Sequence, residues 1–123
     1  MTLTGKRVLV VEDEMLVAMN LEDLLIERGA EVVGPAMRLD TALELARTER
    51  FDVAVLDINL HGGRSYPVAE TLRERKIPFI FATGYGHAEG AEGYAEVPTL
   101  TKPYRASELA DALERALTAS ESD

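Results

Sequence analysis

The sequence predicts an α/β domain in which helices cover both faces of a parallel β-sheet. Short apolar segments alternate with amphipathic segments about five times along the chain, and repeated β-α units of this kind form parallel sheets. The segments VLVV, VAVL and FIF are continuously apolar, which is typical of strands buried on both faces. Because no linker or repeat interrupts the pattern, we expect one domain over residues 1–123, with a core at about 5–118 and a loose tail at 119–123.

The expected elements follow from the period of the apolar residues. Strands are expected at 7–13, 30–36, 51–58, 77–84 and 97–103, and helices at 15–29, 38–50, 64–75 and 105–117. In the first of these helices Val17, Leu21 and Leu24 recur at helical spacing, which makes one face apolar. Met15 and Met19 of the same helix are expected to fill gaps in the core or at a helix interface.

Glycine, proline and serine residues mark several of the expected boundaries. Gly29 is a natural C-cap for the first helix, and Gly34-Pro35 is expected to end the second strand. Pro67 is tolerated only in the first turn of its helix, because a proline farther along would remove a backbone hydrogen bond. Ser107 is the expected N-cap of the last helix, unless that helix begins a residue or two earlier.

The segment between the fourth and fifth strands is unusually rich in glycine. A helix is expected there to return the chain to the next strand, yet residues 84–96 contain Gly84, Gly86, Gly90 and Gly93. Each glycine inside a helix costs roughly 1 kcal/mol of helix stability relative to alanine. We therefore predict a fourth helix that is short, irregular or mobile.

Composition and charge exclude several kinds of partner. Acidic residues outnumber basic residues by 22 to 13, and the formal net charge is −9, so nonspecific binding to nucleic acid or to an anionic membrane is not expected. The chain has no cysteine, which excludes disulfide bonds and thiolate metal sites. Because no apolar segment is long enough to span a membrane, we expect a cytoplasmic protein.

Charged and polar side chains stand where the expected strands end. Glu12 and Asp13 follow the first strand, while Asp57, Thr83 and Lys102 lie at the ends of the third, fourth and fifth strands. In open parallel sheets, ligands bind at the carboxyl ends of the strands. If the first and third strands are neighbours, the three carboxylates converge at this edge.

Three carboxylates that lie close together repel one another, and a raised pKa, a lysine or a cation must offset their charge. A hard divalent ion with oxygen ligands, of which Mg²⁺ is typical, satisfies this requirement. Lys102 adds a positive charge and Thr83 adds a hydroxyl donor. In that setting the Asp57 carboxylate is well placed to attack a phosphoryl group, because the cation and the lysine offset charge on the transferred oxygens. We therefore predict that Asp57 forms an aspartyl phosphate.

Four strings that carry these residues match a known family. VLVVEDE, VAVLDINL, FIFATGY and TLTKPY, in this order and each at a strand end, together resemble the receiver domain of two-component response regulators. The resemblance covers residues 5 to about 118. It implies a flavodoxin-like, doubly wound (βα)5 fold with five parallel strands in the order 2-1-3-4-5 and helices on both faces.

The resemblance implies a metal site with Mg²⁺ as the cofactor. In that comparison Asp13 is a direct ligand of the ion and Glu12 acts mainly through water. Asp57 contributes a carboxylate oxygen, and the backbone carbonyl of Asn59 is the remaining protein ligand.

The resemblance also implies the residues that handle the phosphoryl group. Asp57 is the phosphoacceptor, and Thr83 is the switch hydroxyl that moves toward the phosphoryl group. Lys102 pairs with that group, and Pro103 follows the lysine through a cis peptide bond.

The sequence departs from the common receiver pattern at two positions. Thr99 stands three residues before the lysine, where most receivers carry a tyrosine or phenylalanine, and Gly84 replaces the usual alanine after the switch hydroxyl. FATGY resembles the FAT GUY receivers of alphaproteobacteria, which share the missing aromatic residue. Tyr85 is a candidate for the role of that aromatic.

These features predict a stand-alone receiver rather than an enzyme in the ordinary sense. No output motif follows residue 118, so we expect signalling through altered protein contacts. The resemblance implies a sensor histidine kinase or a histidine phosphotransfer protein as the phosphodonor, and an unidentified downstream protein. A phosphorelay shuttle or a phosphate sink is an alternative role for the same chemistry.

The sequence is also compatible with other classes of function. A flavodoxin-like module that binds a mononucleotide would need a phosphate-binding loop after the first strand, and VEDEML places acidic residues there. A metal-dependent hydrolase would need a general-base histidine, for which the sequence offers no clear candidate. Glu12 and Asp13 also fit an ordinary acidic turn at the start of a helix, where carboxylates are favoured.

Overall fold

A computed structural model describes residues 3–60, 62–84 and 91–121 of the chain. Its strands are β1 (Arg7–Val11), β2 (Glu31–Ala36), β3 (Val53–Asp57), β4 (Asn59–Leu60), β5 (Gly63–Arg64), β6 (Phe79–Thr83) and β7 (Thr99–Thr101). Its α-helices are α1 (Met15–Glu27), α2 (Leu39–Thr48), α3 (Tyr66–Arg75) and α4 (Ala106–Glu121), and η1 (Ala91–Tyr94) is a 3₁₀-helix.

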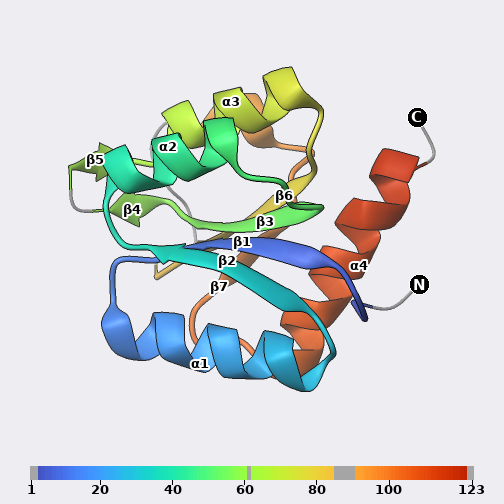
Figure 1. The fold of residues 1–123 in the computed structure, drawn as a ribbon. Coiled ribbons are helices and arrows are strands. Elements are labelled where there is room, and N and C mark those ends of the chain that lie inside the picture. Colours follow the sequence, from blue (N-terminus) through green and yellow to red (C-terminus); the bar gives the residue numbers. More distant parts are fainter. Residues whose placement is uncertain (1–2, 61, 85–90, 122–123) are drawn as a thin grey trace.

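The main sheet is parallel and has the predicted order. Its five strands run β2-β1-β3-β6-β7 (Figure 1). Since β6 and β7 are the fourth and fifth strands of this sheet along the chain, the predicted order 2-1-3-4-5 is confirmed. β1 lies next to β3, with Val10 paired to Val55, and this neighbourhood brings the ends of the first and third strands together.

Helices cover both faces of the sheet (Figure 1). Alternate residues of a strand point to opposite faces. Leu9 and Leu56 therefore contribute to the core beneath α2 and α3, whereas Val10 and Val55 contribute to the core beneath α1 and α4. Both faces are apolar, which explains the continuously apolar strands in the sequence.

Two of the predicted helix boundaries are confirmed. Gly29 follows α1 with a φ of +82°, and its N–H donates to the Ile26 carbonyl at 2.9 Å. The N–H of Ala30 donates to the Leu25 carbonyl at 3.0 Å, which completes the glycine-dependent helix end. Pro67 lies in the first turn of α3, where a missing N–H costs nothing.

The last helix begins at Ala106, so the alternative of a start earlier than Ser107 is confirmed and Ser107 is not its N-cap. The N–H of Arg105 donates instead to Glu108 Oε1 at 2.8 Å, which is the backward half of a capping box. The same helix continues to Glu121, beyond the expected end of the core near 118, since no glycine or proline interrupts it.

The second strand does not end at Gly34-Pro35. It continues to Ala36, which pairs with Val11 after a shift of register. Gly34 has a φ of +95°, and a Cβ atom there would lie 3.0 Å from the Val10 carbonyl oxygen. The glycine therefore permits an irregular but continuous strand.

A small hairpin that the sequence did not predict follows the third strand. β4 and β5 pair antiparallel, with Asn59 opposite Arg64 and Leu60 opposite Gly63. Gly63 has a φ of +138°, and a Cβ atom there would lie 3.3 Å from Leu39 Cδ2 of α2. The hairpin, which follows Asp57 in the chain, therefore packs closely on the start of α2.

The segment expected to form a fourth helix contains a single 3₁₀ turn in its described part. η1 spans Ala91–Tyr94, and residues 85–90 lie outside the described residues. A short and irregular helix agrees with the glycine content of this segment. The candidate role of Tyr85 also lies outside the described residues.

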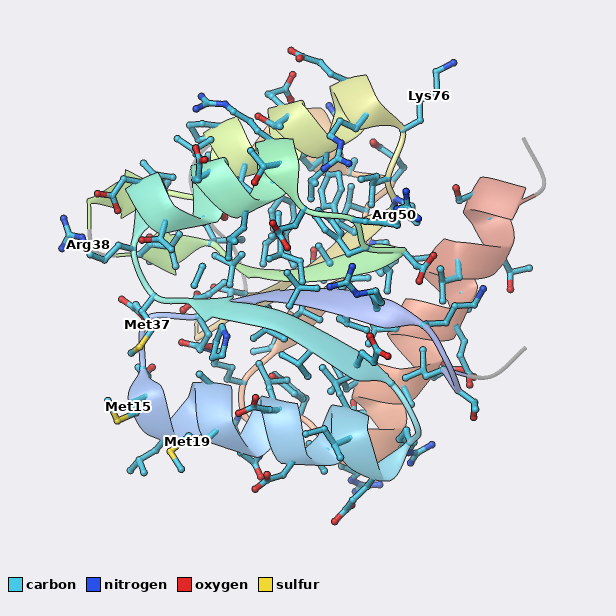
Figure 2. All side chains as sticks on the ribbon, in the orientation of Figure 1. Met15, Met19, Met37, Arg38, Arg50 and Lys76 are labelled. Atoms are coloured by element: carbon cyan, nitrogen blue, oxygen red, sulfur yellow. The ribbon has the colours of Figure 1, made fainter. Side chains whose placement is uncertain are left out.

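The prediction that Met15 and Met19 fill the core is wrong. Their exposed fractions are 62% and 53%, and Leu16 beside them is 80% exposed. Figure 2 shows the side chains of Met15 and Met19 on the outward surface of α1, with Met37 at the same end of the molecule. Helix α1 therefore presents an apolar surface to solvent near the carboxyl ends of the strands.

Within the described ranges, no helix combines the length and the apolar composition that crossing a membrane requires.

Candidate functional site

The predicted site residues meet at the carboxyl end of the parallel sheet. Glu12 follows β1, Asp57 ends β3, Thr83 ends β6 and Lys102 follows β7. Parallel strands bring their carboxyl ends to the same edge of the sheet, and the order of the strands decides which of these ends lie next to each other. The strand order therefore places residues from four distant parts of the chain in one site.

The three predicted carboxylates converge. One oxygen each of Glu12, Asp13 and Asp57 lies within 4.8 Å of the others. Glu12 is 1% exposed and Asp57 is 5% exposed, while Asp13 is half-buried. An ordinary solvated turn would not bury Glu12 next to an aspartate of a neighbouring strand, so the structure argues against the simpler interpretation of Glu12 and Asp13.

Lys102 lies between two buried carboxylates. Its Nζ donates a hydrogen bond to Glu12 Oε1 at 2.6 Å and another to Asp57 Oδ2 at 3.3 Å. Glu14 Oε1 is more distant, at 4.0 Å. The peptide bond between Lys102 and Pro103 is cis, as the resemblance implied. In this arrangement the lysine pairs most closely with Glu12 rather than with the predicted phosphoacceptor.

The charges of the site change the pKa values of its members. The pKa of Asp57 is raised to about 8, chiefly by burial and further by the hydrogen bond and negative charge of Glu12, while Lys102 opposes the increase. Burial lowers the pKa of Lys102, but the two carboxylates outweigh that effect, and its pKa is raised overall. The site therefore contains more negative charge than its lysine neutralises.

This charge imbalance fits a hard divalent cation such as Mg²⁺. Among the described residues, Lys102 is the one cation within salt-bridge distance of Glu12 or Asp57, whereas three carboxylates share the site. Carboxylate oxygens are the ligands that Mg²⁺ prefers. Glu12, Asp13 and Asp57 are the residues that would hold such an ion.

Asn59 lies close to the phosphoacceptor through its backbone. Its N–H donates to Asp57 Oδ1 at 3.3 Å, and the residue is held in β4 opposite Arg64. The hairpin therefore positions the Asn59 backbone at the site. That its carbonyl binds the ion stays a prediction.

Thr83 is held next to Asp57 by the sheet. The residue is 1% exposed, and its neighbour Ala82 pairs with Asp57 across β6 and β3. The N–H of Lys102 donates to the Thr83 carbonyl at 2.8 Å. Backbone pairing thus sets the positions of the phosphoacceptor, the hydroxyl and the lysine relative to one another.

Tyr104 is a neighbour of the site that the sequence did not indicate. It lines a cleft of about 570 Å³ together with Leu16 and Asn20 of α1 and with Lys102. Its hydroxyl is buried and has no hydrogen-bond partner among the described residues. Burial raises the pKa of Tyr104, and the charges of Glu12 and Asp57 raise it further. The cleft opens beside the lysine, and Tyr104 forms part of its wall.

The binding of Mg²⁺ is expected to depend on pH. A proton and a cation compete for the Asp57 carboxylate, whose pKa is about 8. The apparent affinity for Mg²⁺ is therefore expected to rise by about tenfold per pH unit from about pH 6 to about pH 8 and then to level off. Titration calorimetry in buffers of different protonation enthalpy would measure the affinity and the released proton. Asp57→Asn should remove the proton release, and a pH-independent affinity in wild type would contradict the raised pKa.

The chain is similar to known signalling proteins over most of its length. Residues 8–114 match the response regulator receiver domain family. The transcriptional regulatory protein PdtaR of Mycobacterium tuberculosis is 31% identical over 117 residues, which are 92% of this chain and 57% of PdtaR. The chain thus spans little more than half the length of that curated relative.

Solved structures agree with the family match. The solution structure of SdrG from Sphingomonas melonis Fr1 is 38% identical, with a TM-score of 0.77, and the match covers 98% of this chain and 99% of that one. The PhyR receiver domain of Erythrobacter litoralis is 29% identical, with a TM-score of 0.82 and coverages of 94% and 92%. A CheY-like receiver protein of Methanospirillum hungatei shares the fold, with a TM-score of 0.85 at 23% identity over 97% of this chain and 98% of that one. The chain therefore belongs to the response regulator receiver domain family.

Proposed function

We propose that this receiver accepts a phosphoryl group on Asp57 from a phosphohistidine of a sensor histidine kinase or a histidine phosphotransfer protein. The observation that carries the proposal is the buried Asp57 carboxylate, which lies with Glu12 and Asp13 and within hydrogen-bond distance of Lys102. A structural aspartate has no need of two further acids, because their repulsion is costly. A phosphoryl acceptor that uses a divalent cation accounts for all of these residues.

The chemistry is a direct transfer. An Asp57 oxygen attacks phosphorus, the bond from phosphorus to the donor imidazole nitrogen breaks, and the electron pair leaves with the imidazole. Lys102 moves its ammonium from Glu12 and Asp57 to the transferred oxygens, where charge develops. Thr83, at the end of the neighbouring strand, donates its hydroxyl to one of them. A bound Mg²⁺ would offset the negative charge that gathers in the site.

The exposed apolar surface of α1 supports a helical protein as the donor. Met15, Leu16 and Met19 are exposed at the start of α1, and Leu16 also lines the cleft with Lys102 and Tyr104. Exposed apolar patches often mark protein-binding surfaces. A helix that carries the phosphohistidine would cover this surface and enter the cleft beside Lys102.

The output of this receiver would be a change in protein contacts. Asp57 is consumed and regenerated, so we do not regard the chain as an enzyme in the ordinary sense. The surface that would change consists of η1, β7 and α4, because these elements flank the strands that lead to Thr83 and Lys102. A cytoplasmic location, with neither nucleic acid nor membrane as a partner, fits the net charge of −9.

The test is a phosphotransfer experiment. Incubation with acetyl phosphate and Mg²⁺, followed by intact-mass measurement, should add one phosphoryl group, and removal of Mg²⁺ should reduce the addition by at least about 100-fold. The proposal would be contradicted if neither acetyl phosphate nor a phosphorylated histidine kinase added a phosphoryl group to the protein. Onward transfer to a second histidine protein would identify a shuttle, and loss to water alone would favour a switch or a sink. A flavodoxin-like mononucleotide module would instead take up a nucleotide without any mass change at Asp57.

A further inference from the structure

A second network of side chains joins residues 93–96, which precede β7, to helix α3. Its centre is Tyr94, the last residue of η1, which is 8% exposed. The Tyr94 ring stacks on Tyr66 of α3 with 5.4 Å between ring centroids, and it packs edge-on against Phe81 of β6 at the same separation. This one ring therefore contacts both a helix and the strand that ends in the site.

The polar side of Tyr94 is held by α3. Its hydroxyl donates a hydrogen bond to Glu70, and the Arg73 guanidinium carbon lies 4.2 Å from the ring centroid. Arg73 also donates to the Gly93 carbonyl at 2.8 Å and pairs with Glu96 at 2.5 Å. We call Tyr94, Glu70 and Arg73 the Tyr94 anchor. The anchor ties the described part of the chain between β6 and β7 to α3.

The composition of β7 explains why the ring comes from η1. Thr99 is the β7 residue that pairs with Phe81, and it is exposed and too short to cover the phenylalanine ring. Tyr94 supplies the aromatic ring that this position of β7 lacks. Because alternate residues of a strand share a face, Phe81 and Thr83 point to the same side of β6. The ring thus packs against the strand, on the face to which the site hydroxyl belongs.

We propose that the Tyr94 anchor restrains the phosphoryl site: it holds residues 91–98 in a resting position, and phosphorylation of Asp57 releases them. This inference rests on the function proposed above. Tyr94 contacts Phe81, and Thr83 follows two residues later with its carbonyl bonded to the Lys102 N–H at 2.8 Å. A movement of Thr83 toward a phosphoryl group therefore disturbs the packing of the ring. Contacts that are made only in the resting state stabilise that state relative to the phosphorylated state by the free energy that they contribute.

The hydrogen bonds of the Tyr94 anchor can be broken at a low cost in free energy. The Glu70 and Arg73 side chains are 58% and 36% exposed, so water replaces their hydrogen bonds when Tyr94 leaves. The net free energy of a hydrogen bond that water can replace changes an equilibrium constant by about tenfold or less. Such a contact is strong enough to favour one state and weak enough for phosphorylation to overcome.

Tyr94→Phe tests the proposal, because it keeps the ring and removes the hydrogen bond to Glu70. The initial rate of phosphorylation by acetyl phosphate with Mg²⁺ should rise about three- to tenfold. Amide exchange at residues 91–98 of the unphosphorylated variant should rise toward the level that wild type reaches with Mg²⁺ and beryllofluoride, a phosphoryl mimic. Thr71→Val is the matched control, since it removes a hydroxyl from the same helix, one that donates to the Pro67 carbonyl at 3.0 Å, and leaves the Glu70 contact. We expect it to match wild type within about twofold.

The proposed restraint would be contradicted by either of two other results. A Tyr94→Phe protein that is phosphorylated at the wild-type rate, or more slowly, excludes a restraint on the site. Increased exchange throughout the chain at an unchanged rate assigns Tyr94 a purely structural role. Failure of the proposed function has a different signature: wild type then gains no phosphoryl group at Asp57, and the anchor has nothing to restrain.

Discussion

Asp57→Asn is expected to abolish phosphoryl addition, with a decrease in rate of at least about 1000-fold. The amide has nearly the same shape as the carboxylate but has no anionic oxygen with which to attack phosphorus. Intact-mass measurement after incubation with acetyl phosphate and Mg²⁺ gives the rate. Asp52→Asn is the matched control, because Asp52 lies just before the other end of β3 and accepts a hydrogen bond from the Arg7 N–H, which an asparagine oxygen also accepts. Addition of a phosphoryl group to Asp57→Asn at the wild-type rate would place the acceptor elsewhere.

The same substitution has a second expected effect, on stability. The pKa of Asp57 is about 8 in the folded protein and near 3.8 in an unfolded chain. The folded state therefore binds a proton more tightly, and stability is lost as the pH rises through this window. Without metal, Asp57→Asn should raise the melting temperature by about 5 °C or more near pH 8 and have little effect near pH 4. An unchanged melting temperature at the higher pH would show that the carboxylate is not destabilised by burial.

Lys102→Met is expected to slow phosphoryl addition by about 100-fold while preserving the fold. The lysine bridges Glu12 at 2.6 Å and Asp57 at 3.3 Å, and in transfer it would stabilise the charge on the phosphoryl oxygens. Loss of one such group typically costs about 3 kcal/mol in the transition state. Stopped-flow or quenched measurements with a saturating phosphodonor would give this rate. Lys76→Met is the matched control, because Lys76 is exposed at the end of α3 (Figure 2).

Lys102→Met also tests whether the charge of the lysine neutralises the carboxylates of the site. Removal of one partner from a buried ion pair leaves the other charge uncompensated. The pKa of Asp57 should therefore rise further, and Mg²⁺ should stabilise Lys102→Met more than it stabilises wild type in thermal unfolding. Equal stabilisation of the two proteins by Mg²⁺ would indicate that the lysine does not neutralise the carboxylates.

Much of the site follows from local patterns. Continuously apolar runs placed the strands, and each run stops at Glu12, Asp57, Thr83 or close to Lys102. Parallel strands present their carboxyl ends at one edge, so the convergence of these residues could be predicted once β1 and β3 were neighbours. The strand order itself came from the resemblance to a family, because periodicity alone does not say which strands are adjacent.

Other features have no local signal. Tyr94 is one of two tyrosines in a glycine-rich segment, and its burial depends on Tyr66 and Phe81, which come from α3 and β6. The burial of Tyr94 cannot be read from sequence spacing, since it depends on which elements pack against the ring. The exposure of Met15 and Met19, by contrast, does follow from spacing, because a helix turns by about 100° per residue and this places both methionines on the side of α1 opposite Leu21.

The amino-acid pattern specified the order of elements and the chemical types of side chain at the ends of the strands, because period, caps and chain direction are local properties. It did not specify which partner each side chain chooses. Lys102 lies closer to Glu12 than to Asp57, at 2.6 Å against 3.3 Å. Such differences arise from the packing of distant segments against one another, and they are settled only when the sheet and its helices are assembled.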